Sequence, residues 1–223
     1  MRRGLIAALL IALGAIGGVI IGNSTIADPA ASRPAITTAP ELASSSFIGD
    51  GRELLTPAQL LTATRAGVLP SGTKSLLATT GRMRHGEYKW DEKGVAPGKV
   101  TIWVDLRTQL ISVFRGGHEI GTSVIVYGAD TMQSPIGTFP ILSKHRDYHS
   151  RAYDAPMPYS LFITNTGVAL HGSPMSSRRA THGCIGLPVD FARLLFAAAE
   201  QGDEVQITRS TANPMHASRR ETR

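Results

Sequence analysis

Apolar and polar residues alternate in short runs from Lys99 onward. Such alternation predicts β-strands, because successive side chains of a strand point to opposite faces. The runs lie at residues 100–104, 110–114, 121–127, 137–142, 161–164, 168–170 and 204–208. The glycine pair Gly116-Gly117 supplies a hairpin turn between the second and third runs. The pattern therefore indicates a meander of antiparallel strands over the first three runs and further strands after them.

Two segments carry the start signals of helices. Thr56 is a favourable N-cap residue, and Pro57 follows it at the first helical position. A second helix is expected to begin at Pro188 and to stop before Gly202, with Asp190 in its first turn. Its buried face is expected to consist of Phe191, Leu194, Leu195 and Ala198. The predicted fold class is mainly β with one or two short helices.

The N-terminal end has the features of a targeting segment. Arg2 and Arg3 precede an uncharged apolar run at residues 4–22. Residues 1–27 are expected to be either a cleaved signal peptide or a retained membrane anchor, since the run is about as long as a spanning helix. Either outcome predicts export of the chain.

The remaining chain divides by composition. Residues 28–46 are rich in Ala, Ser, Thr and Pro and are expected to form a flexible linker. Residues 47–98 form a short N-terminal extension of unknown role, and 99–208 form the β-rich domain. Residues 209–223 are expected to be a basic, disordered tail.

The charge distribution bears on possible partners. The chain has a formal net charge of +6, but the β-rich domain has nine basic and nine acidic residues. The basic excess lies in the flanking segments. This distribution argues against a nucleic-acid-binding face on the fold, and no nucleic-acid partner is expected.

Cys184 is the most informative residue for chemistry, because it is the single cysteine of an exported chain and cannot form an internal disulfide. It follows His182 and Gly183 and comes shortly before the predicted second helix. An imidazole and helix N-terminal amides nearby would lower the thiol pKa and provide donors for an oxyanion. Cys184 is therefore a candidate nucleophile, while an inert core thiol and an intermolecular crosslink stay open.

His171 is the candidate base for this thiol. It ends a predicted strand 13 residues before Cys184, so one turn of chain can bring the two side chains together for thiol acyl transfer. Another interpretation also fits the spacing. His171 would then be a hydrogen-bonded strand-end residue and Cys184 a small buried apolar residue.

A zinc site is the main rival hypothesis. His145 and His149 would share one face of a helix and could bind zinc with Asp154. However, residues 144–158 lack a helical apolar stripe, and a polar loop is the expected structure there. No phosphate-binding or nucleotide motif is present in the sequence. We therefore expect no metal and no other cofactor.

Several segments together resemble a known family, the L,D-transpeptidase catalytic domain, also called the YkuD domain. The resemblance covers about residues 99–208. Its most specific parts are Ala169-Leu170-His171-Gly172-Ser173 and Thr181-His182-Gly183-Cys184-Ile185, which look like the family's HG…[S/T]HGC signature. Weaker matches occur in the same order upstream, at Val104-Asp105-Leu106, at residues 134–139 and at Met157-Pro158-Tyr159.

The resemblance implies a YkuD β-sandwich or barrel located in the periplasm or cell envelope. The reaction would proceed through an acyl-enzyme on a cysteine and would need no cofactor. Cys184 would match the nucleophile, His171 the base and the Gly172 carbonyl the group that orients the imidazole. His182 and Gly183 would flank the nucleophile at the oxyanion hole. The family's substrate cleft would contain Tyr159, Ser173, Thr181 and Gly186.

The implied substrates are peptidoglycan tetrapeptide stems, from which Cys184 would release D-alanine. The acceptor is left open: another stem gives a 3→3 crosslink, a lipoprotein lysine gives anchoring, a D-amino acid gives exchange and water gives carboxypeptidase trimming. A non-catalytic wall-binding protein is a further alternative. Residues 4–22 would add the membrane as a partner if they are retained.

The chain departs from the family pattern in two ways. Gly186 stands two residues after the cysteine, where the family usually has arginine, so a cation is missing there. Nine residues separate His171 from Thr181, fewer than in many members of the family. Substrate preference and the acceptor are the properties that these departures affect.

Overall fold

The computed structural model describes residues 46–48, 51–128, 132–175 and 181–211. All of them belong to the second of the chain's two units, Pro40–Arg223. The expected signal or anchor at 1–27 lies outside the described residues, as does the linker except for Ser46. Neither helix in the described part of the chain is long and apolar enough to cross a membrane.

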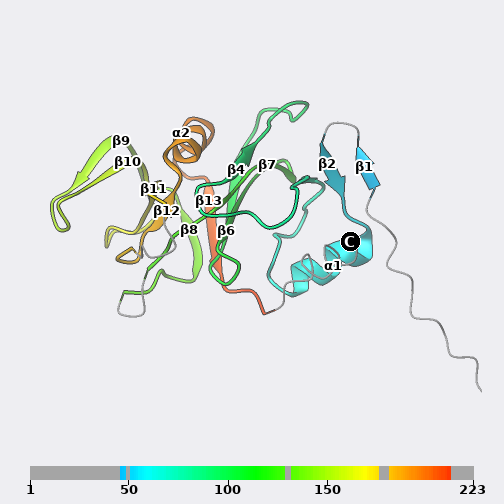
Figure 1. Ribbon diagram of the computed structural model, residues 1–223, viewed down its shortest axis with the longest axis horizontal. Helices are drawn as coiled ribbons and strands as arrows, with labels where there is room; N and C mark the ends of the chain where they lie inside the picture. The colour runs from blue at the N-terminus through cyan, green and yellow to red at the C-terminus, as the bar shows by residue number, and fades with distance from the viewer. Residues whose placement is uncertain (1–45, 49–50, 129–131, 176–180, 212–223) are drawn as a thin grey trace, which may run out of the picture. The chain divides into compact units, whose positions relative to one another are not determined.

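A six-stranded sheet contains most of the strands that the alternation predicts (Figure 1). Its order is β4-β7-β6-β5-β13-β8, and β13 pairs parallel to β5 and antiparallel to β8. The bounds are β4 Tyr88–Trp90, β5 Val100–Asp105, β6 Leu110–Arg115, β7 His118–Val124, β8 Gly137–Pro140 and β13 Glu204–Thr208. The hairpin turn at the glycine pair joins β6 to β7, as predicted.

A four-stranded sheet has the order β12-β11-β10-β9. Its strands are β9 Ser143–Ser150, β10 Ala155–Phe162, β11 Ala169–Gly172 and β12 Ile185–Leu187. The β11–β12 pair is parallel, and the other pairs are antiparallel. The predicted polar loop at 144–158 is wrong: these residues form most of the long β9–β10 hairpin (Figure 1).

The two sheets and helix α2, Val189–Ala198, share one hydrophobic core. The six-stranded sheet contributes side chains such as Ile102, and the four-stranded sheet contributes Leu161, Leu170 and Ile185. Phe191 of α2 is completely buried in this core. The mainly β fold class, with two short helices among the described residues, is confirmed.

The extension at 47–98 covers the other face of the six-stranded sheet. Helix α1, Pro57–Arg65, begins at the predicted Thr56 cap, which forms a full capping box with Gln59. A small sheet accompanies it, composed of β1 Ser46–Ile48, β2 Arg52–Leu54 and β3 Leu76–Leu77. A second apolar cluster joins Ala63, Leu69 and Leu76 of the extension to Phe114 and Trp103. The extension therefore shields apolar side chains that the sheet would otherwise expose.

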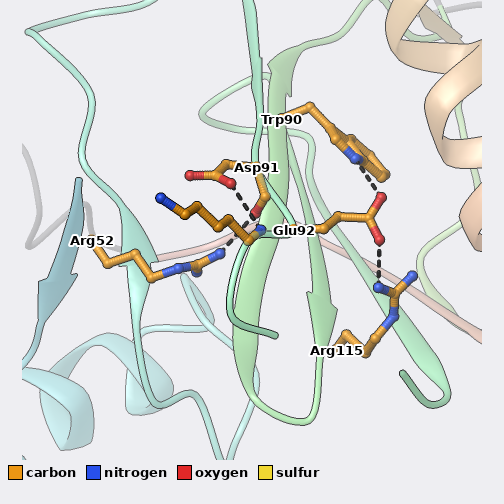
Figure 2. A network of polar contacts seen from close by, with 6 residues as sticks. Arg52, Trp90, Asp91, Glu92 and Arg115 are labelled. Carbon is orange, nitrogen blue, oxygen red and sulfur yellow. Dashed lines mark hydrogen bonds and ion pairs between the residues drawn. The ribbon is translucent and has the colours of Figure 1, made fainter. Parts of the chain in front are cut away.

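Arg52 links the extension to the edge of the six-stranded sheet (Figure 2). Its side chain is buried and donates hydrogen bonds to the backbone carbonyls of Glu119, at 2.6 Å, and Asp91, at 2.7 Å. Nearby, Glu92 accepts hydrogen bonds from Trp90 and Arg115. Strand β4 also comes from the extension and pairs with β7. The boundary predicted at residue 99 therefore falls within a continuous sheet.

The start of the predicted C-terminal tail is ordered. Ser210 is buried, and its hydroxyl and backbone amide both donate hydrogen bonds to the carboxylate of Asp105. The amide of Thr211 donates to the carbonyl of Ala66 at 3.1 Å. The rest of the tail, 212–223, lies outside the described residues.

Gly121 leaves room for an aromatic ring over β7. It pairs with Trp90 of β4, and a Cβ atom at this position would lie 2.3 Å from a carbon of the Trp90 ring. We expect Gly121→Ala to lower the free energy of unfolding of the full-length protein by about 1–3 kcal/mol in urea titrations, since the ring must move. In a Trp90→Ala background the same change should cost much less, because the colliding ring is gone. An equal cost in both backgrounds would contradict this explanation.

Candidate active site

The parallel pair β11–β12 positions His171 and Cys184. Leu170 lies opposite Ile185, and His171 lies opposite Gly186; Cys184 comes directly before β12. Leu170 and Ile185 are fully buried in the core, so their chain neighbours His171 and Cys184 point to the other face of the sheet. The fold therefore brings the two candidate residues to adjacent strands and to one face.

His171 is held as a neutral imidazole. Its side chain is buried, and Nδ1 lies 2.9 Å from the carbonyl oxygen of Gly172, which can only accept a hydrogen bond. Nδ1 therefore carries the proton, and Nε2 is left as the basic nitrogen. Burial lowers the pKa of His171 below its ordinary value, although the Gly172 carbonyl opposes this change. The expected contact between the imidazole and the Gly172 carbonyl is present.

Cys184 is held as a protonated thiol. Its sulfur lies 3.7 Å from the carbonyl oxygen of Gly167, to which the thiol donates. Burial raises the pKa of the Cys184 thiol above its ordinary value, and a hydrogen bond from the Ala169 backbone offsets part of the increase. The expectation of a lowered thiol pKa is therefore wrong. In the chain, strand β12 lies between Cys184 and the start of α2.

The turn from Thr181 to Cys184 presents the thiol. The Thr181 amide donates to the carbonyl of Tyr127 at 3.1 Å, and the Thr181 hydroxyl donates to the carbonyl of Cys184. Gly183 has a φ of 98°, a backbone conformation that favours glycine. The sequence signature around Cys184 therefore also encodes the shape of this turn.

His182 lies on the outer side of the turn. Its exposed ring stacks on Tyr153, with centroids 4.1 Å apart and planes at 10°. Tyr153 belongs to the connection between β9 and β10 and is 47% exposed. The end of the hairpin therefore reaches the residue two positions before Cys184.

Tyr159, expected in the substrate cleft, packs against helix α2. Its ring packs edge-on against Phe196 of α2, with centroids 5.9 Å apart, and the Arg146 guanidinium lies 5.9 Å above it. The backbone φ of Tyr159 is 57°, which is unusual for a bulky residue. Pro158, the preceding residue, is the one that contacts Gly172. The structure thus places Tyr159 on the helix side of β10, without a contact to the thiol.

Gly186 has no space for a side chain. A Cβ atom there would lie 2.6 Å from Val126 and 3.0 Å from the Cβ of Ser173. Backbone hydrogen bonds hold Gly186 to Val126 in both directions, at 2.7 and 3.0 Å. Ser173 therefore fills the space beside Gly186, and its own hydroxyl donates to the carbonyl of Pro174. An arginine at position 186 would require this packing to rearrange.

A shallow groove of about 300 Å³ opens beside Gly167, the partner of the thiol. Phe162 in its wall pairs with Ala169 across the sheet, so the groove lies on the same face as Cys184. The lining contains one histidine and one tyrosine but no carboxylate, lysine or arginine. The lining residues are Leu142, Ser143, His145, Tyr148, Phe162, Thr164, Asn165 and Gly167.

The zinc hypothesis loses its geometric basis. His145 and His149 lie on strand β9, where residues four apart are about 13 Å from each other. His149 instead lies 3.6 Å from the carboxylate of Asp154. Within the described parts of the chain, no group of three or more His, Cys, Asp or Glu side chains could hold a metal ion.

Sequence reasoning missed the groups that surround the thiol. The Gly167 carbonyl and the Ala169 amide act through the backbone, so residue type gives no signal for them. Tyr148 lines the groove from the part of the hairpin that was expected to be a loop, and Phe162 lines it from the predicted strand at 161–164.

Comparisons with known proteins now identify the domain. Residues 99–207 match the family model of the L,D-transpeptidase catalytic domain, YkuD. This part of the chain is therefore a YkuD domain. A comparison with curated proteins gave no significant match.

Solved L,D-transpeptidases are also similar to this chain. One from Stackebrandtia nassauensis is 26% identical, with a TM-score of 0.47 over 51% of this chain and 58% of that one. One from Mycobacterium tuberculosis is 22% identical, with a TM-score of 0.46 over 49% and 57%. A mutant from Enterococcus faecium is 28% identical, with a TM-score of 0.45 over 50% of each chain. This chain thus spans between half and three fifths of the length of these proteins.

Proposed function

We propose that the chain is a cell-envelope cysteine acyltransferase that acts on peptidoglycan stem peptides, with Cys184 as nucleophile and His171 as base. One observation carries the proposal: the β11–β12 register brings Cys184, directly before β12, and His171 of β11 to the same face, where burial favours a protonated thiol and a neutral imidazole. These are the protonation states that base-assisted thiol attack requires. The YkuD match supplies the substrate class.

In the proposed acylation, Nε2 of His171 takes the thiol proton while Sγ of Cys184 bonds to the stem carbonyl carbon. The carbonyl electron pair moves onto oxygen, and the backbone amides of Gly183 and Cys184 are the nearest candidates to stabilise it. When the carbonyl re-forms, the bond to the D-alanine nitrogen breaks. The imidazolium then returns its proton to the departing amine, and a thioester remains on Cys184.

The Gly172 carbonyl has a second use in this step. It accepts a hydrogen bond from Nδ1 of His171, which fixes the orientation of the ring. The same hydrogen bond stabilises the imidazolium that forms transiently. An incoming amine or water then attacks the thioester. His171 takes the proton of this attacker, and the proton passes to the departing sulfur. Crosslinking, D-amino acid exchange, lipoprotein anchoring and trimming share all of these steps and differ in the attacker.

The groove beside Gly167 supports a substrate path to the thiol. It lies on the face of the sheet that carries Cys184, and it combines aromatic, hydroxyl and amide groups. Such a lining suits a peptide, whose backbone needs hydrogen-bonding partners and whose aliphatic parts need apolar contacts. We place part of the donor stem in this groove.

The proposal includes a location outside the cytoplasm. Arg2, Arg3 and the apolar run at 4–22 support export, either with cleavage or with retention in the inner membrane. The linker at 28–46 would separate the folded unit from the membrane if the run is retained.

The test uses purified full-length protein with tetrapeptide muropeptides and a D-amino acid, followed by mass spectrometry. Crosslinked or exchanged products that are absent with Cys184→Ala are expected for a transpeptidase. Tripeptide as the sole product would mean that water is the preferred attacker and that the chain is a carboxypeptidase. Unchanged muropeptides would contradict the proposed enzyme and favour a wall-binding protein.

A further inference from the structure

The carbonyl of Cys184 has a side-chain partner. Thr181, which the family resemblance placed in the substrate cleft, donates its hydroxyl hydrogen bond to this carbonyl. The bond spans three residues and closes the turn that presents the thiol. The hydroxyl therefore has a partner in the protein before any substrate arrives.

The turn is anchored at both ends but not in the middle. At one end, the Thr181 amide binds the Tyr127 carbonyl at 3.1 Å; at the other, Gly186 and Val126 exchange two backbone hydrogen bonds. Among the residues that the structure describes, no other hydrogen bond reaches the backbone of residues 182–184. The Thr181 hydroxyl is thus the contact that sets the backbone path between the two anchors.

This path decides where the turn's amides point. Peptide units are rigid planes, so holding the Cys184 carbonyl restricts the rotations that orient its neighbours. Gly183, with its positive φ, would otherwise allow the turn to adopt several backbone conformations. Within the described parts of the chain, the amides of Gly183 and Cys184 donate to no backbone carbonyl. Pre-oriented donors of this kind lower the barrier of acyl transfer.

We infer that Thr181 is a positioning residue, whose hydroxyl holds the Cys184 carbonyl so that the amides of the thiol-bearing turn stay ready for the developing oxyanion. The inference rests on the proposed function of Cys184. It replaces the expected substrate contact of Thr181 with a role inside the protein. Loss of the hydroxyl should therefore slow the step that forms an oxyanion and leave the exposure of the thiol nearly unchanged.

Two reactions of Cys184 separate these effects. Acylation by a carbapenem, a strained β-lactam, passes through a tetrahedral oxyanion. Alkylation by iodoacetamide displaces iodide from carbon and develops no oxyanion. Both rates are measured by intact mass on the full-length protein, in which Cys184 is the single cysteine. The ratio of the two rates reports on the amides of the turn, whereas a displaced thiol would change both rates together.

Three variants complete the test. Thr181→Val removes the hydroxyl and keeps the shape, and Thr181→Ser keeps the hydroxyl. Thr62→Val is the matched control, because Thr62 on α1 also donates its hydroxyl to a backbone carbonyl, that of Ala58 at 2.8 Å, far from the site in sequence.

We expect Thr181→Val to slow carbapenem acylation by about tenfold or more while alkylation changes by less than about threefold. In muropeptide turnover, kcat should fall with little change in KM. Thr181→Ser should restore most of the acylation rate, and Thr62→Val should match the wild type. Equal losses in both reactions, or no loss in Thr181→Val, would overturn the inference. Absence of acylation in the wild-type protein would instead contradict the proposed function, on which the inference depends.

Discussion

Cys184→Ala is expected to abolish both muropeptide turnover and carbapenem acylation, while the protein stays folded. The sulfur is the sole atom in the proposed site that forms a covalent bond to the acyl group, so no other side chain can replace it. The chain has one cysteine, which makes the mass readout specific: the wild-type protein should gain one acyl adduct and the variant none.

The fold of the Cys184→Ala variant serves as the control. The thiol donates one long hydrogen bond, to the Gly167 carbonyl, and accepts one from the Ala169 backbone, and their loss should lower the free energy of unfolding by about 1 kcal/mol. Urea titration of both proteins measures this difference. Turnover that persists in a folded variant would rule out Cys184 as the nucleophile.

His171→Asn is expected to slow acylation by about 10²–10⁴-fold. An asparagine amide can still donate to the Gly172 carbonyl, as Nδ1 of His171 does, but it provides no base in place of Nε2. The substitution therefore removes the proton acceptor and retains the local hydrogen bond. Stopped-flow or quenched mass measurements of acylation give the rate, and a loss below about threefold would contradict the role of His171.

The pH dependence of the acylation rate also distinguishes the wild type from His171→Asn. Burial lowers the pKa of His171 below the ordinary value of 6.5. As the pH is lowered, the acylation rate of the wild type should therefore decline only below pH 6.5, where the imidazole becomes protonated and can no longer accept the thiol proton. In His171→Asn the inflection that the imidazole causes should vanish. Burial also raises the pKa of Cys184 above 9.0, so the residual rate of the variant should keep rising with pH beyond that value as thiolate forms. If the acid decline of the wild-type rate has its midpoint above pH 6.5, the pKa of His171 is not lowered and the imidazole is not neutral at rest.

Local patterns predict the six-stranded sheet well and the β9–β10 hairpin poorly. In β5, alternate residues such as Ile102 and Val104 are buried, so burial leaves a period of two in the sequence. In β9, residues 145–149 are all exposed, and the strand lies at the edge of its sheet. An edge strand without a buried face has no such period. Pro156 and Pro158 in β10 add signals against a strand.

The candidate site is predictable in residue type and less so in its electrostatics. His171 and Cys184 stand out through their spacing and their neighbours, and the parallel pairing of β11 with β12 joins them. The direction of the Cys184 pKa depends instead on burial by the fold. The space at Gly186 is filled by Val126, a residue about sixty positions away in the chain. Sequence spacing around a motif contains no information about such distant contacts.

The place of β13 in the six-stranded sheet has a consequence for how the chain folds. This strand lies between β5 and β8, and it pairs Glu204 with Thr101 and with Pro140. Until β13 arrives, β5 and β8 each keep an unpaired edge, because nothing else in the sheet order joins them. Contacts between residues so far apart form slowly. Before the segment of β13 is in place, the edges of β5 and β8 that it covers are therefore open, and those edges are where the chain would associate with other chains.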